Sequence, residues 1–127
     1  HGLASPLGAF FPIPHGVVCG TLVAEATHVN IESMRKREPD NPALRRYLRI
    51  AEIICSQRIR DPQMAWHMLV DRLAAWTEHM QLPRLSEYGL TVSDLDHVVA
   101  HSRGSSMKTN PIILDDGELH GILEQRL

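Results

Sequence analysis

Cysteine is scarce in this sequence of 127 residues, which contains only Cys19 and Cys55. The two residues do not form a CxxC pair, so the sequence indicates neither a disulfide framework nor a zinc knuckle. Chains without a disulfide framework are typical of reducing compartments. We therefore expect a cytoplasmic protein.

An excess of charge of one sign is also missing. The chain has 13 Lys and Arg residues against 15 Asp and Glu residues, a net charge of −2, and no basic stripe, which makes nucleic acid a poor candidate partner. Polar residues interrupt every hydrophobic stretch before the roughly 20 residues needed to cross a bilayer, which excludes a membrane-spanning helix. With 43% hydrophobic and 22% charged residues, the sequence fits one compact soluble domain or part of a larger protein.

Two histidines lie at the ends of a segment that cannot form one straight helix. A straight helix from His1 to His15 would hold the two imidazoles roughly 21 Å apart, because each residue advances about 1.5 Å. Gly8 weakens a helix interior, and Pro12 and Pro14 interrupt it. The sequence therefore predicts a short helix, a bend at the two prolines and a new helix that begins near His15. Imidazole is a common metal ligand, but two histidines need further ligands to complete a site.

Three runs in this segment carry a resemblance to a known family: residues 1–4 (HGLA), 6–10 (PLGAF) and 14–17 (PHGV). They resemble the signature of the iron-containing alcohol dehydrogenases. The resemblance implies a metal ion, Fe²⁺ or alternatively Zn²⁺, held by one aspartate and three histidines, of which the last two match His1 and His15. It also implies NAD(P), bound mainly by a separate N-terminal domain.

The same resemblance implies the fold and the domain. Residues 1–127 are expected to be the C-terminal helical metal-binding domain, of the dehydroquinate synthase-like and iron-containing alcohol dehydrogenase fold. In this interpretation the chain is a fragment that lacks the dinucleotide-binding domain.

The sequence departs from the family pattern at two places. Ser5 stands where the family usually carries another histidine, and Val18-Cys19-Gly20 stands where it usually has Ala-Asn-Ala. We assign Ser5, Phe10 and Phe11 to a substrate pocket beside the metal, with core packing as the alternative for the two phenylalanines. Cys19 could reach the metal site, although the sequence favours a buried small hydrophobic residue.

The resemblance implies an enzyme that interconverts small alcohols with aldehydes or ketones, and a homodimer. The isolated chain is expected to be inactive and to retain no metal, because two neutral imidazoles supply too few ligands and no negative charge. Two alternatives stay open. One is a related dehydrogenase of glycerol or another polyol, and the other is a helical interaction module without catalysis.

A second pair of histidines, His97 and His101, has the H-x-x-x-H spacing that places both rings on one helical face. No acid or cysteine with matching spacing joins them as a further ligand. They share the polar side of their helix with Asp94 and Asp96, so we expect an exposed, metal-free surface.

Start signals and apolar periodicity predict an all-α bundle of five or six helices without strands. Asn41-Pro42 and Asp61-Pro62 each place a capping side chain before a proline, which is typical of a helix start. A mostly apolar helix is expected over residues 14–30, followed by a polar linker over 31–41. Further predicted start signals are Thr91 with Asp94, and Asp115 or Asp116.

Burial follows from the same periodicity. One apolar stripe is predicted to be core: Trp66, Leu69, Leu73, Trp76 and Met80. The polar side of the last helix is predicted to face water: Glu118, His120, Glu124 and Gln125.

Overall fold

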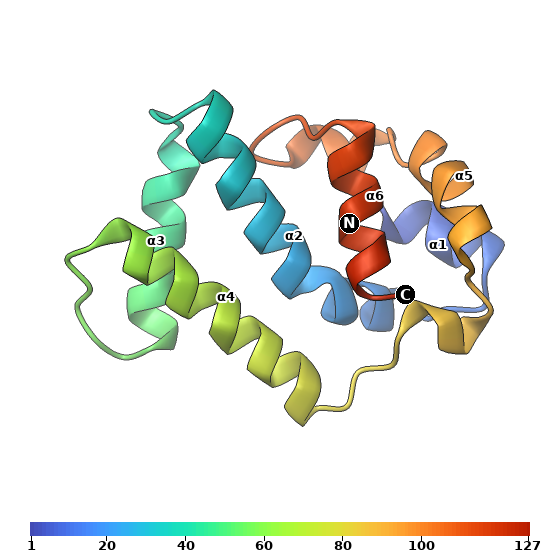
Figure 1. Ribbon diagram of the computed structural model, residues 1–127, viewed down its shortest axis with the longest axis horizontal. Coiled ribbons are helices and arrows are strands. Elements are labelled where there is room, and N and C mark those ends of the chain that lie inside the picture. The colour runs from blue at the N-terminus through green and yellow to red at the C-terminus, as the bar shows by residue number, and fades with distance from the viewer.

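The structure is a computed structural model that describes residues 1–127, and all of its regular elements are helices (Figure 1). The α-helices are α1 (Ala4–Phe10), α2 (His15–Arg37), α3 (Pro42–Ile54), α4 (Pro62–His79), α5 (Leu95–Ala100) and α6 (Asp116–Gln125). Three short 3₁₀ helices are η1 (Leu85–Tyr88), η2 (Val92–Asp94) and η3 (Ser105–Thr109). The prediction of an all-α fold without strands is confirmed. No helix combines the length and the apolar character that crossing a membrane would need.

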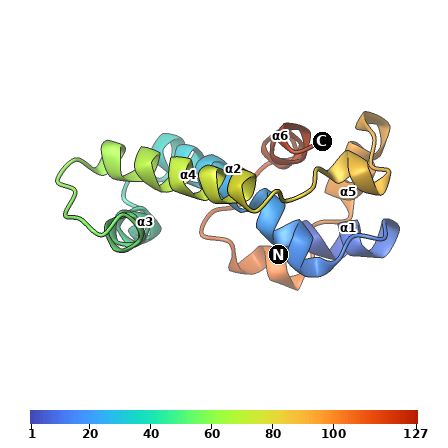
Figure 2. The same cartoon turned by 90° about the horizontal axis from the view of Figure 1, so that it is seen from below.

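Helix α2 runs through the middle of the molecule, and α1, α3, α4 and α6 all contact it. Figure 1 shows the α3–α4 hairpin on one side of α2, and α6, with α1 and α5 beyond it, on the other; Figure 2 shows the same arrangement from below. The main hydrophobic core lies around α2 and includes its residues Val18, Leu22, Ile31 and Met34. A smaller cluster lies within the hairpin and consists of Ala51, Ile59, Ala65 and Leu69. The nearly all-apolar helix of the sequence is therefore the central helix of the fold.

The predicted end of this helix is wrong, because α2 continues through residues 31–37 of the expected polar linker and ends at Arg37. Ile31 and Met34 extend its buried face by another turn and are almost completely inaccessible. Basic residues in the last turn are favourable at the negative end of a helix dipole, and Arg35, Lys36 and Arg37 occupy that turn. These three basic residues therefore belong to the last turn of a helix and not to a linker.

The capping signals in the sequence mark helix starts correctly. The Asn41 side chain accepts a hydrogen bond from the Ala43 backbone N–H at 2.9 Å, and Asp61 accepts one from Gln63 at 3.1 Å. Asp115, one of the two predicted caps, accepts from the Glu118 N–H at 2.8 Å. Caps depend on contacts within about three residues, which explains why the sequence suffices to predict them.

The predicted apolar stripe of α4 is only partly buried. Leu69 is 1% exposed, but Trp76 is 42% and Met80 is 60% exposed. The buried line of α4 follows Ala65, Leu69 and Thr77 instead, so it is rotated away from the predicted stripe. Figure 1 shows the C-terminal end of α4 extending beyond α3, where no helix covers the outer side. Trp66 and Leu73 are half-buried, and the Trp66 Nε1–H donates to the Leu44 carbonyl at 3.0 Å.

Glu118 does not simply face water as predicted. Its carboxylate accepts hydrogen bonds from Ser33 Oγ at 2.5 Å, from Arg37 at 2.6 Å and from the Asp115 N–H at 2.8 Å, and 20% of its side chain is exposed. Burial alone would raise the pKa of Glu118, but the bonds from Arg37, Ser33 and Asp115 outweigh it and lower the pKa from 4.5 to about 2. This cluster joins the C-terminal end of α2 to the N-terminal end of α6.

We expect Glu118→Gln to lower the free energy of unfolding by about 2 kcal/mol at pH 7, since it removes charge-assisted hydrogen bonds. Because folding lowers the pKa of Glu118, the ionised form stabilises the fold above about pH 4.5, and this contribution disappears as the pH falls towards 2. Denaturant titrations at pH 7 and pH 3 measure the difference. Glu124→Gln, exposed on the same helix, is the matched control and should change stability by less than about 0.5 kcal/mol. An equal effect of both substitutions at pH 7 would contradict the assignment.

Candidate metal centre

The two histidines of the N-terminal segment meet because the chain reverses between α1 and α2. Phe11, which follows α1, is in an extended conformation, and Pro14 precedes α2 with φ −59° and ψ 137°. Ile13 is buried at the bend and anchors it in the main core. His15 therefore becomes the first residue of α2, and the predicted bend is confirmed.

The rings of His1 and His15 lie against each other at the surface. Their centroids are 5.2 Å apart and their planes make an angle of 39°. Both residues are exposed, so either ring can bind an ion without first breaking a core contact. A straight helix would hold these two rings roughly 21 Å apart, and the bend brings them together.

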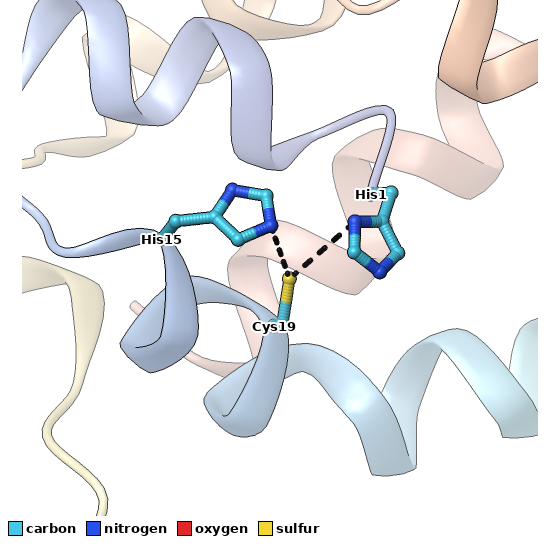
Figure 3. Close-up of side chains that lie close together, drawn as sticks. All are labelled: His1, His15 and Cys19. Atoms are coloured by element: carbon cyan, nitrogen blue, oxygen red, sulfur yellow. Dashed lines mark hydrogen bonds between the residues drawn. The ribbon is translucent and has the colours of Figure 1, made fainter.

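Cys19 completes a cluster of three potential ligands. Its Sγ lies 3.5 Å from His15 Nε2 and 4.0 Å from His1 Nδ1, and the ligand atoms of all three residues lie within 4.8 Å of one another. Figure 3 shows the sulfur between the two rings. Cys19 follows His15 by four residues and thus shares its face of α2. The sequence favoured a buried hydrophobic role for Cys19; the residue is instead half-buried and contacts both histidines.

A cavity of about 370 Å³ lies beside this cluster, with His1 and Cys19 in its wall. Its other walls come from the start of the chain, α2, the segment around η3, and α6, and are mostly apolar. Asn30 and Asn110 at the cavity wall bond each other reciprocally at 3.1 and 2.6 Å. A small organic molecule with one polar end fits such a cavity, because apolar walls surround it and the polar groups lie at a few points.

The residues that the sequence assigns to a substrate pocket are not part of this cavity wall. Ser5 is exposed, and Phe11 packs against the main core. The ring centroid of Phe10 lies 4.6 Å from that of His97. The assignment of these three residues to a substrate pocket stays a prediction based on the resemblance.

His97 and His101 are exposed, as predicted, and their ring centroids are 4.4 Å apart. His101 Nδ1 lies 2.8 Å from the His97 carbonyl oxygen, which suits an N–H donor at that ring position. No acidic or thiol side chain joins the pair to form a group of three ligands. The partner that sequence analysis did not anticipate is Phe10, which lies 4.6 and 5.3 Å from the two rings and links α1 to α5.

Comparison with known proteins identifies the fold. No family model matches the sequence, and no curated protein sequence matches it either. Two solved structures share the fold over 100% of this chain with a TM-score of 0.82. One is a 1,3-propanediol oxidoreductase, with 19% sequence identity. The other is a histidine-to-alanine variant of an alcohol dehydrogenase from a halo-thermophilic archaeon of a Red Sea brine pool, with 23% identity.

The chain spans 32% of the length of each of these two proteins. The names of both proteins describe oxidoreductases that act on alcohols. The structural similarity confirms the fold that the N-terminal motif implied. The sequence identities are low, so the likeness concerns the fold and not the residues of a site.

We expect His97→Ala combined with His101→Ala to leave the metal content of the protein unchanged, because the pair has no third ligand. The same double substitution should lower the unfolding temperature slightly, since Phe10 loses both ring contacts. Elemental analysis after dialysis and a thermal melt measure the two effects. Loss of bound metal from the double variant would show that this pair, and not the cluster around His15, is the binding site.

Proposed function

We propose that this chain is the C-terminal metal-binding domain of an NAD(P)-linked alcohol dehydrogenase, in which His1 and His15 hold a divalent metal ion. The observation that carries the proposal is the pair of imidazoles 5.2 Å apart at the bend between α1 and α2. Support comes from the motif that contains both histidines and from the fold shared with two alcohol oxidoreductases.

The residues of this chain contribute position and shape. The buried side chains of Leu3 and Leu7 fix α1 against the core, and Val18 fixes the first turns of α2, so the two rings are presented from packed elements. The cavity beside them offers mostly apolar walls to a bound alcohol or aldehyde. When bound, Fe²⁺ or Zn²⁺ supplies Lewis-acid polarisation of the substrate oxygen.

The remaining parts of the enzyme are proposed to lie outside residues 1–127. The resemblance places NAD(P) on a separate N-terminal domain, together with an aspartate and a further histidine as metal ligands. This division agrees with the length of the two similar proteins, of which the chain spans about a third. We further propose a homodimer in the cytoplasm that acts on a small alcohol or aldehyde.

A polyol dehydrogenase is the second candidate. One of the similar structures is by its name an oxidoreductase of 1,3-propanediol, a substrate with two hydroxyl groups. The amides of Asn30 and Asn110 in the cavity wall bond each other, and each side-chain oxygen keeps a lone pair that can accept a hydrogen bond from a second hydroxyl group. A comparison of kcat/KM for propanol and 1,3-propanediol distinguishes the two candidates. The third interpretation is a helical interaction module without catalysis. Metal bound at His15 would argue against it.

We expect His15→Ala to remove most of the bound metal from the complete protein and to lower NAD(P)H-dependent aldehyde reduction at least about 100-fold, since one ligand is lost. The fold should persist, because His15 is exposed. His28→Ala, exposed on the same helix, is the matched control. Elemental analysis measures the bound metal, circular dichroism measures the fold, and NAD(P)H oxidation in the presence of an aldehyde measures the activity. Unchanged metal content in His15→Ala would refute the proposed function.

Residues 1–127 alone should reduce no aldehyde with NADH, even when metal is added. Hydride transfer needs the nicotinamide held against the substrate carbon, and a coenzyme free in solution forfeits about 7–11 kcal/mol that fixed geometry contributes in well-oriented models. The assay compares the isolated chain with the complete protein at equal metal loading. Turnover by the isolated chain would mean that the coenzyme site lies within these residues.

A further inference from the structure

We infer that the Cys19 thiolate is a third metal ligand, so that this chain supplies a His1–His15–Cys19 site with a preference for zinc. The inference rests on the proposed function, since it concerns the same ion, and it adds a ligand that the aspartate and three histidines of the resemblance do not include. The observation behind it is the cluster of one sulfur and two nitrogens within 4.8 Å.

The two sulfur–nitrogen distances are close to those of tetrahedral coordination. Zinc bonds of about 2.3 Å to sulfur and 2.0–2.1 Å to nitrogen place a sulfur and a nitrogen ligand roughly 3.6 Å apart. The observed separation of Cys19 Sγ from His15 Nε2 is 3.5 Å, and that from His1 Nδ1 is 4.0 Å. The first distance needs no adjustment, and the second needs a small shift of an exposed ring.

The three ligands are presented by packed elements. His15 and Cys19 lie one turn apart on α2, and the buried Val18 and Leu22 hold that part of the helix in the core. His1 precedes Gly2, where an added Cβ would lie 2.5 Å from Met107 Cε. The close approach of Gly2 to Met107 therefore holds the start of the chain against η3, and His1 Nδ1 lies 4.0 Å from Cys19 Sγ on α2.

The chemistry of the donor set distinguishes this site from one built of histidine and carboxylate alone. A thiolate supplies a negative charge, and soft sulfur ligands favour zinc over iron(II). Within residues 1–127 the three side chains are the number of protein ligands that a catalytic zinc site commonly has. The cluster lies beside the cavity, because His1 and Cys19 belong to both.

A third ligand also changes what is expected of residues 1–127 on their own. The expectation of no retained metal counted two neutral imidazoles. With the Cys19 thiolate added, the chain should retain close to one zinc ion after dialysis, although it still lacks a coenzyme site.

A reactive Cys–His pair is the other chemistry that a distance of 3.5 Å allows. Nucleophilic pairs usually have a third group that orients the imidazole. No hydrogen bond orients His15 here, whereas a second imidazole lies on the other side of the sulfur. Metal binding is therefore the interpretation that accounts for all three residues.

The test is a Co²⁺ titration of the metal-free complete protein, followed by absorption spectroscopy. We expect a thiolate-to-cobalt charge-transfer band in the near ultraviolet. Cys19→Ala should abolish this band and weaken zinc binding at least about tenfold. Cys55→Ala is the matched control, because Cys55 is the other cysteine of residues 1–127 and lies at the end of α3, and it should leave both band and affinity unchanged.

Thiol alkylation gives a second readout that does not depend on activity. In the Cys55→Ala variant, alkylation at Cys19 is followed by peptide mass spectrometry: Cys19 should react with iodoacetamide in the metal-free protein and be protected when zinc is saturating. Two results would overturn the inference but leave the proposed function standing. One is cobalt binding that depends on His15 but shows no charge-transfer band, and the other is equal alkylation of Cys19 with and without zinc. If neither His15→Ala nor Cys19→Ala affects cobalt binding, the inference and the proposed function are both overturned.

Discussion

The rest of the structure depends on the hydrogen bonds that buried polar groups of α2 must make. Thr21 donates to the Pro83 carbonyl and accepts from Arg126, Asn30 pairs with Asn110, and Ser33 donates to Glu118. Leaving such a buried group without a partner costs about 1–3 kcal/mol. These bonds therefore hold the C-terminal half of the chain in one register along α2, in addition to the non-directional packing of its apolar residues.

This register also builds the candidate site. The first turns of α2 carry His15 and Cys19, and the proline bend returns α1 so that His1 lies beside them. The C-terminal half, held along α2 by the bonds above, supplies the opposite wall of the cavity through the segment around η3 and α6. The site thus consists of an N-terminal ligand cluster and a C-terminal wall, and either part would be incomplete without α2 between them.

The two positions at which the sequence departs from the alcohol dehydrogenase pattern both affect the possible metal ligands. Ser5, where a histidine is usual, is exposed and lies outside the cavity wall, so an imidazole is missing from α1. Cys19, where an asparagine is usual, contacts both remaining histidines. Under our proposal, a nitrogen donor is absent at one position of the pattern and a sulfur donor is present at another.

The sequence by itself determined the features that depend on a few neighbouring residues: the proline bend, the helix starts at Asn41 and Asp61, and a start at Asp115 or Asp116. Each observed cap bonds a backbone N–H within three residues. Only the tertiary structure decided which surfaces are covered. The extension of α2 to Arg37, the exposure of Trp76 and the contact of Cys19 with His1 all depend on segments that are distant in sequence. Apolar periodicity identifies a face of a helix, but burial depends on what packs against that face, and this is set by the fold as a whole.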